Sequence, residues 1–296
     1  MSIKLSKLLV VVGPTSSGKT SLSIKLAKDF NGEVISADSR QVYKGMDIGT
    51  GKITKKEMQG IKHYLLDVVS PKTDYNVNKF VQDASKAIKQ INKKNKLPII
   101  CGGTMFWVDA LLYGLPETTK PDSQLRKKLD QLNTKQLFNK LKKLDPQRAA
   151  NIDAYNKRRL IRALEIIIKT GQPVPQYIKK KQYDVLKIGV KRSKDELKER
   201  MHDRLLARIR QGMIAEVKRL HEQGVAWQRL EYFGLEYRWI TRYLRGLITK
   251  DEMLERLELE INHYAKRQMT WFKKDNEIIW ENDYNKIKKK VIQWLK

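Results

Sequence analysis

The chain has little cysteine and no long hydrophobic segment. Its only cysteine among 296 residues, Cys101, excludes an internal disulfide framework. Cys101 closes the apolar run 98–101, so we expect a buried thiol rather than a nucleophile. No apolar run approaches the roughly 20 residues that a membrane helix needs, and a first strand near Leu8 leaves no room for a signal peptide. These absences predict a cytoplasmic protein that does not enter a membrane.

Acidic residues are scarce relative to basic ones. The chain has 61 Lys and Arg residues against 33 Asp and Glu residues, a formal net charge of +28. An enzyme that acts only on small molecules has little need of this charge, whereas a polyanion such as nucleic acid would be attracted by it. A lysine-rich proteome, in which many surfaces become basic, is the alternative explanation. The charge therefore favours a nucleic-acid partner.

A glycine-bounded loop stands between an apolar run, residues 8–12, and an amphipathic segment, residues 21–30. Glycine at both ends permits backbone angles that other residues disfavour, so successive N–H groups can turn inward around phosphate oxygens. The dipole of the following helix, a lysine ammonium and a threonine hydroxyl that can bind Mg2+ complete the site. An ATP kinase, an NTPase and an enzyme that expels pyrophosphate would all share it. The loop reads Gly13-Pro14-Thr15-Ser16-Ser17-Gly18-Lys19-Thr20.

Alternating strand and helix patterns predict an α/β fold. Apolar runs predict strands at 8–12, 33–37, 64–69, 98–101, 187–190 and 277–280. Amphipathic segments predict helices between them, among them 78–94, and a long helix over 251–273. We expect a P-loop NTPase-like parallel sheet flanked by helices, formed by residues 1–117 together with 184–296.

Residues 118–183 show no convincing strand, and their charge is higher. Helices fit 123–132, 134–144 and 156–169, so we expect an all-helical insertion domain. On the last of these helices Arg158, Arg159 and Arg162 lie opposite the apolar face, where the core would tolerate their replacement. Three arginines with a single nearby acid, Glu165, favour phosphate contact over a merely solvated charged face.

Polar residues follow the second and fourth predicted strands. Ligand sites of open α/β sheets lie at the carboxyl ends of the strands, so Asp38 and Gly102-Gly103-Thr104 should lie beside the phosphate loop. There Asp38 can accept a proton or bind a metal, or it can simply cap a turn. Thr104 supplies a hydroxyl, or belongs to a plain strand-to-helix turn. Asp67 is either a Walker-B-like metal partner or, as we prefer, a strand-end aspartate.

These segments resemble the tRNA dimethylallyltransferases of bacterial type, also called tRNA isopentenyltransferases. The matching segments run in family order over nearly the whole chain: 13–20, 36–50, 63–67, 102–104, 158–165 and 265–271. The phosphate loop alone is generic, but the block Asp38-Ser39-Arg40-Gln41-Val42-Tyr43 is much more specific. The family's glycine-tyrosine-basic turn matches Tyr237 and Arg238, with Gly234 displaced.

The resemblance implies a reaction and a set of site residues. The phosphate loop would hold the diphosphate of dimethylallyl diphosphate, assisted by Mg2+ at Thr20. The acceptor would be the N6 amine of the adenosine 3′ of the anticodon in tRNA, with Asp38 as the base and Thr104 and Lys19 at the reacting groups. Arg204 is expected to hold the pyrophosphate, with Arg200 a close competitor. The positions expected to contact tRNA are Asp38, Ser39, Arg40, Gln41, Thr104, Arg126, Arg158, Arg159, Leu160, Ile161, Arg162, Tyr237 and Arg238.

Two other classes of function stay open at this point. One is a small-molecule transferase, either an adenylate isopentenyltransferase or an ATP-dependent nucleoside-type kinase. The arginine-bearing insertion argues against it, because a nucleotide acceptor does not need such a domain. The other is a non-enzymatic RNA-binding module, which the convergence of Asp38 and Thr104 on the phosphate loop disfavours. We expect a monomeric enzyme.

Overall fold

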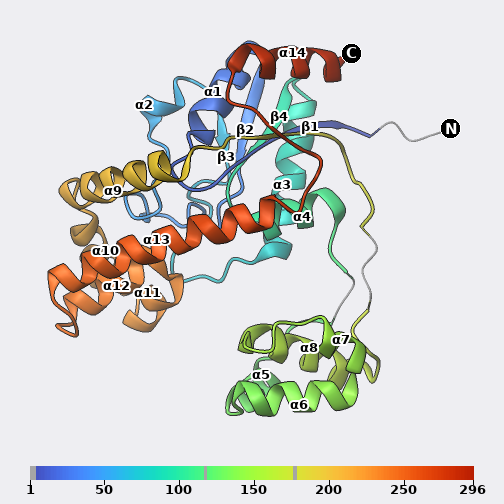
Figure 1. Cartoon of the computed structure of the whole chain (residues 1–296), viewed down its shortest axis with the longest axis vertical. Coiled ribbons are helices and arrows are strands. Elements are labelled where there is room, and N and C mark those ends of the chain that lie inside the picture. The colour runs from blue at the N-terminus through green and yellow to red at the C-terminus, as the bar shows by residue number, and fades with distance from the viewer. Residues whose placement is uncertain (1–4, 117–118, 176–178) are drawn as a thin grey trace. The chain divides into compact units, whose positions relative to one another are not determined.

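The computed structural model describes residues 5–116, 119–175 and 179–296 (Figure 1). The chain divides into two compact units. Met1–Gly114 and Lys181–Lys296 form one, called here the core unit, and Leu115–Lys180 form the other, called here the helical unit. The boundary predicted between residues 117 and 118 lies outside the described residues.

The sheet of the core unit has six parallel strands in the order β3-β2-β4-β1-β5-β6. Cys101 pairs with both Val11 and Ser36, so the carboxyl ends of the three central strands meet at one edge. This arrangement confirms the predicted α/β fold. The strand bounds are β1 Lys7–Val12, β2 Gly32–Ser36, β3 His63–Tyr64, β4 Leu97–Cys101, β5 Asp184–Gly189 and β6 Ile278–Trp280.

The third strand is shorter than predicted. Only His63 and Tyr64 pair with β2, whereas the apolar run predicted a strand over 64–69. Leu65 and Asp67 adopt left-handed backbone angles, with φ of 62° and 55°. Because extended strands require negative φ, these two residues end the strand.

Helices cover both faces of the sheet. Successive strand residues point to opposite faces, and here both sets are buried. Leu9 and Val11 pack in one core with α1 (Lys19–Asp29) and α14 (Tyr284–Leu295). Leu8 and Val10 pack on the other face in a larger core that includes α3 (Val77–Asn92) and α4 (Met105–Tyr113). The other helices of this unit are α2 Lys55–Met58, α9 Lys194–Arg210, α10 Met213–Glu222, α11 Trp227–Phe233, α12 Leu235–Leu244 and α13 Lys250–Phe272.

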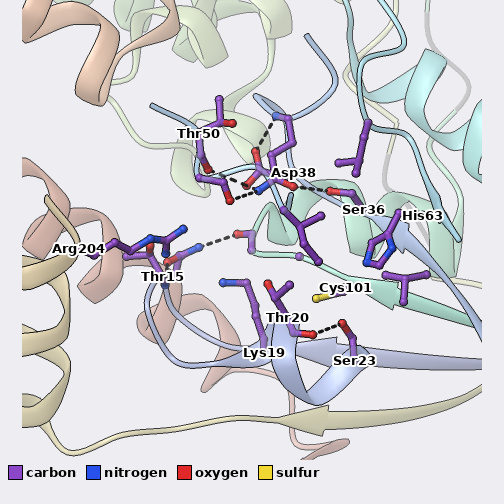
Figure 2. A pocket seen from close by; sticks show the side chains of 18 of the residues that line it. Thr15, Lys19, Thr20, Ser23, Ser36, Asp38, Thr50, His63, Cys101 and Arg204 are labelled. Carbon is purple, nitrogen blue, oxygen red and sulfur yellow. Dashed lines mark hydrogen bonds between the residues drawn. The ribbon is translucent and has the colours of Figure 1, made fainter. Parts of the chain in front are cut away.

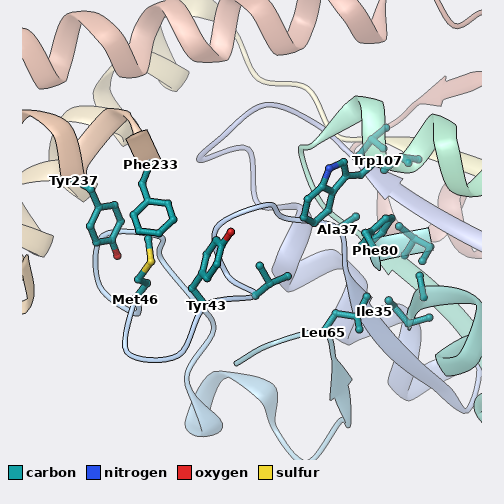
Figure 3. Close-up of a cluster of buried hydrophobic side chains, with 14 of the residues drawn as sticks. Ile35, Ala37, Tyr43, Met46, Leu65, Phe80, Trp107, Phe233 and Tyr237 are labelled. Atoms are coloured by element: carbon teal, nitrogen blue, oxygen red, sulfur yellow. The ribbon is translucent and has the colours of Figure 1, made fainter. Parts of the chain in front are cut away.

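The segment that follows β2 packs against α11 and α12 (Figure 3). The rings of Tyr43 and Phe233 lie 4.9 Å apart, and Phe233 lies 6.0 Å from Tyr237. Met46 is fully buried in the same cluster. This packing joins the chain just after Asp38 to helices from near the other end of the sequence.

The helical unit has its own apolar core. Leu137, Leu141, Leu160 and Leu164 are fully buried in it. Each helix begins at a polar side chain that accepts a hydrogen bond from a backbone amide of the first turn, which sets the helix boundary. The capping residues are Asp122, Asn133, Asp145 and Asn156, and the helices are α5 Ser123–Asp130, α6 Thr134–Leu144, α7 Pro146–Ala150 and α8 Lys157–Thr170.

No helix within the described ranges combines the length and the apolarity that crossing a membrane requires.

Candidate active site

The phosphate loop connects β1 to α1 at the carboxyl edge of the sheet. Gly13 and Gly18 have φ of 154° and 97°, angles that residues with a Cβ rarely adopt. α1 begins at Lys19, and Gly18 has no side chain that could cap it. The amides of the first helical turn are therefore available to an anion, together with the positive end of the helix dipole.

A polar pocket lies directly beside this loop (Figure 2). Lys19 and Thr20 line it from α1, Asp38 from the segment after β2, and Arg204 from α9. The Lys19 ammonium donates to the carbonyl oxygen of Pro14 at 3.1 Å. Burial lowers the pKa of Lys19, and the Arg204 cation acts in the same direction. An anion in the pocket would offset both effects, because it would stabilise the charged lysine.

Asp38 both caps its own turn and faces the pocket. Its Oδ1 accepts hydrogen bonds from the amides of Arg40 at 2.8 Å and Gln41 at 3.3 Å. In the part of the chain that the structure describes, no hydrogen bond to Oδ2 is found. The two interpretations of Asp38 are therefore compatible, since one oxygen shapes the turn and the other can accept a proton.

Thr104 lies next to the Asp38 turn. Its Oγ1 accepts a hydrogen bond from the amide of Ser39 at 3.1 Å, and its own amide donates to the carbonyl oxygen of Ala37 at 3.2 Å. These two bonds join the start of α4 to the residues on either side of Asp38. The structure thus brings the second and fourth strand ends together, as the strand-end argument predicted.

Gln268 is a pocket residue that the sequence analysis did not single out. Its Oε1 accepts from the Thr15 amide at 2.8 Å, and its Nε2 donates to the Gly103 carbonyl oxygen at 3.0 Å. The side chain is buried, 1% exposed, between the phosphate loop and the turn that precedes Thr104. The sequence did contain a signal, because Gln268 is a polar residue on the α13 face that buries Ala265 and Phe272.

Arg204 and Arg200 differ in their surroundings. Burial and the neighbouring Arg208 cation lower the pKa of Arg204 to about 10. Within residues 5–116, 119–175 and 179–296, no hydrogen bond or ion pair of Arg204 is found, although it lines the pocket. Arg200 instead donates to the Ser16 carbonyl oxygen at 2.9 Å and lies 3.8 Å from Glu196. Arg204 is therefore the arginine that is placed to receive an anion.

The residues present suit a magnesium ion that is held mainly by a bound diphosphate. The described residues contain no group of three or more His, Cys, Asp or Glu side chains that could hold a metal alone. Thr20 offers a hydroxyl at the pocket, and Mg2+ commonly takes few protein ligands and completes its shell with phosphate oxygens and water. Asp67 lies three residues beyond the end of β3 and forms an ion pair with Lys52 at 2.5 Å.

Three residues expected to contact tRNA are held by protein contacts in the core unit. Arg40 donates through Nε to the Phe233 carbonyl oxygen at 2.8 Å. Tyr237 is only 2% exposed, and its hydroxyl donates to Glu216 at 2.8 Å, so an RNA contact by its side chain is not available. Arg238 is partly exposed and lies 3.4 Å from Glu260. The Tyr237 ring packs in the apolar core, so only the backbone of this residue could reach RNA.

The predicted arginine face of the helical unit is only partly exposed to solvent. Arg158 and Arg159 are exposed. Arg126 and Arg162 both bind the buried carboxylate of Glu165. Arg162 is therefore bound to a buried group of the unit. This differs from the prediction that the core would tolerate its replacement. Leu160 and Ile161 are buried, so their side chains pack in the unit and only their backbone could reach RNA.

The fold and the pocket together define an α/β enzyme of the P-loop type. A protein-family model described as IPP transferase matches residues 41–275. The chain is 40% identical to the tRNA dimethylallyltransferase of Acetivibrio thermocellus, over 99% of this chain and 97% of that protein. It is 41% identical to the corresponding protein of Anoxybacillus flavithermus, over 93% of this chain and 89% of that one. The chain therefore belongs to the IPP transferase family.

Solved structures agree with this assignment. The full-length tRNA isopentenylpyrophosphate transferase of Bacillus halodurans superposes with a TM-score of 0.73 at 36% identity, covering 98% of this chain and 95% of that one. A eukaryotic dimethylallyltransferase described as acting on tRNA superposes with a TM-score of 0.78 at 30% identity, covering 90% and 69% of the two chains.

Proposed function

We propose that this protein transfers a dimethylallyl group from dimethylallyl diphosphate to the N6 amine of the adenosine 3′ of the anticodon in tRNA, releasing pyrophosphate. The observation that carries the proposal is the shared pocket, in which the Lys19 and Arg204 cations and the Asp38 carboxylate line one space. Such a transfer needs cations for a leaving diphosphate and a base for an amine. Relatives at about 40% identity that carry the name tRNA dimethylallyltransferase support the same reaction.

The proposed step forms one bond and breaks another. The N6 nitrogen bonds to the allylic carbon that carries the diphosphate, and the carbon–oxygen bond breaks with its electron pair going to pyrophosphate. Loop amides, Lys19 and Arg204 stabilise the charge that develops on the leaving group. Asp38 takes the proton that the amine loses, a contribution of typically ~10²–10⁴ in rate.

Mg2+ would add to this stabilisation. Bound to diphosphate oxygens and to the Thr20 hydroxyl, the ion would neutralise leaving-group charge as a Lewis acid. Lys19 and Arg204 act on the same oxygens as direct hydrogen-bond donors and cations. Thr104 and Gln268 hold the loops that carry these groups at fixed separations.

RNA binding would be divided between the units. A stacked adenine cannot enter a pocket at the sheet edge, so the base must leave the anticodon loop. The exposed Arg158 and Arg159 would contact the phosphate backbone, which positions RNA without reading its sequence. A cytoplasmic location and a monomeric state stay predictions from the sequence.

The test is pyrophosphate release from dimethylallyl diphosphate by the purified protein with Mg2+. Release is expected only when tRNA is added, and the tRNA should gain the prenyl group. Release with AMP in place of tRNA would instead identify an adenylate isopentenyltransferase. Phosphoryl transfer from ATP to a nucleoside would identify a kinase. Tight tRNA binding with no turnover of any donor would indicate a non-enzymatic RNA-binding module.

A further inference from the structure

The buried carboxylate of Glu216 on α10 holds the loop that closes one side of the pocket. Its Oε2 accepts hydrogen bonds from the amides of Asp47 at 2.9 Å and Ile48 at 2.7 Å. Its Oε1 accepts from the Gly49 amide at 3.0 Å and from the Tyr237 hydroxyl at 2.8 Å. The Glu216 residue is 1% exposed. Four donors thus converge on one carboxylate, which offsets the cost of burying its charge.

The Glu216 carboxylate occupies an anion-binding site that is formed by backbone amides of the same protein. Three consecutive amides that point to one place form a concave site for an anion. Here the anion comes from a helix whose other buried side chains, Met213, Val217 and Leu220, are apolar. A turn alone would not require a buried charge on a distant helix. Glu216 therefore fixes the backbone of residues 47–49 to helix α10, which lies 167 to 169 positions away in the sequence.

The loop that Glu216 holds is also connected by hydrogen bonds to the turn that carries Asp38. Residues Thr50 and Gly51 line the pocket. The Gln41 Nε2 donates to the Gly51 carbonyl oxygen at 3.3 Å and, at a longer 3.5 Å, to that of Thr50. The Gln41 amide in turn donates to Asp38 Oδ1. The loop is thus connected to the Asp38 carboxylate through a single residue, Gln41, whose side chain binds the loop and whose backbone amide binds Asp38.

The same loop also supports the arginines on α9. A Cβ on Gly51 would lie 2.1 Å from a guanidinium nitrogen of Arg204 and 1.7 Å from one of Arg208, so both side chains pack against the bare Gly51 backbone. Arg208 also donates to the Gly49 carbonyl oxygen at 3.3 Å. A shift of this backbone would therefore displace Arg204, the cation assigned to the diphosphate.

We propose that Glu216 is a positioning residue for the transfer reaction: by binding the amides of residues 47–49, it sets the separation between the Asp38 base and the Arg204 cation. The proposal rests on the function proposed above. Glu216 does not touch substrate, so its effect passes through Gln41 and Gly51. Misplacement of reacting groups by about 1 Å can cost on the order of a hundredfold in rate.

Glu216→Gln tests this inference, because the amide keeps the shape but replaces one acceptor oxygen by a donor that faces N–H groups. We expect kcat for prenyl transfer to fall at least about tenfold and the Kd for inorganic pyrophosphate, measured by calorimetry, to rise several-fold. The KM for tRNA should change much less than kcat, because the exposed Arg158 and Arg159 are untouched.

Two variants serve as controls. Glu33→Gln alters another buried acid of the core unit, which binds Lys94, Lys96 and the Tyr64 hydroxyl and does not line the pocket. It should lower the unfolding temperature and leave kcat and pyrophosphate affinity unchanged. Tyr237→Phe removes only the fourth donor to Glu216 and leaves the three amides bound, so its kinetics should stay close to wild type.

The outcomes separate the two proposals. If Glu216→Gln lowers stability as Glu33→Gln does but keeps wild-type kcat and pyrophosphate affinity, Glu216 is purely structural and the inference is wrong. If the wild-type protein transfers no prenyl group, the proposed function fails. The pyrophosphate affinities of wild type and Glu216→Gln still decide whether Glu216 positions the anion site.

Discussion

The buried carboxylate of Glu165 binds the guanidinium of Arg126 at 2.8 Å. The carboxylate side chain is fully buried, whereas the Arg126 side chain is 42% exposed. Arg162 binds the same carboxylate from one turn away on α8. Two arginines expected to contact tRNA are therefore oriented by one internal acid, with their outer edges still exposed to solvent. Removing either arginine would leave part of a buried charge unpaired, which is costly.

Glu165→Gln should destabilise the protein in a pH-dependent way. Burial acts to raise the pKa of Glu165, but hydrogen bonds from Arg126, the Asp122 amide and Arg162 outweigh it and lower the pKa to about 2 from a usual 4.5. A carboxyl group whose pKa is lower in the folded state stabilises the fold at any pH above its pKa in the unfolded chain. This contribution disappears as the pH falls from about 4.5 towards 2. Thermal unfolding from pH 7 to pH 3 should show the difference from wild type shrinking as pH falls.

The control for this prediction is Asp130→Asn. Asp130 pairs with Lys157 at 3.2 Å, but its side chain is 68% exposed. Exposed pairs contribute little, so the change should stay within about 0.5 kcal/mol. A destabilisation by Glu165→Gln that is constant across the pH range would mean that the lost interaction is not the carboxylate charge.

Arg159→Ala should weaken tRNA binding without disturbing the fold. Arg159 is exposed on α8, so it is a cleaner probe than Arg162. Loss of one phosphate contact should reduce the log–log salt slope of tRNA affinity by about 0.7–0.9. Lys142→Ala on α6 removes an equal exposed charge from the same unit and should leave the slope unchanged. Parallel slopes for Arg159→Ala and wild type would show that this arginine is merely solvated.

The fold was largely predictable because its signals are local. Apolar runs mark the buried strands, and capping residues such as Asn133 and Asn156 mark helix starts. The length of the third strand was predicted wrongly because hydrophobicity does not reveal the sign of the backbone angle φ. Leu65 and Asp67 follow an apolar start, but both have a positive φ, which ends the strand.

The sequence predicted the positions of the site residues that directly follow strands. It did not predict positions that depend on contacts between residues far apart in the chain. Asp38 and Thr104 meet because neighbouring parallel strands end at one edge. Gln268 acts on Thr15 from 253 positions away, a relationship that no local spacing encodes. Similarly, the burial of Tyr237 depends on a partner, Glu216, on another helix.

Lys19→Ala should preserve the fold and abolish most transfer activity. In the described structure the Lys19 ammonium hydrogen bonds only to the Pro14 carbonyl oxygen, so its loss costs the free protein little. Its removal takes away a cation that faces the proposed diphosphate, which should weaken pyrophosphate binding and slow departure of the leaving group. Calorimetry and transfer assays measure the two effects. Lys28→Ala, which removes an exposed cation from the same helix, should retain activity; near-normal turnover by Lys19→Ala would exclude the loop as the diphosphate site.

Asp38→Asn should lower the rate of the chemical step and leave donor affinity nearly unchanged. The amide retains an oxygen that can accept the hydrogen bonds from Arg40 and Gln41, so the turn should persist. What is lost is the capacity to take the proton of the adenine amine. Single-turnover prenyl transfer at saturating tRNA should slow by ~10²–10⁴, the usual contribution of a general base. Pyrophosphate affinity, measured on the same preparation, reports whether the phosphate loop is intact. A loss of less than about tenfold, with the loop intact, would assign Asp38 to positioning of the amine rather than to proton transfer.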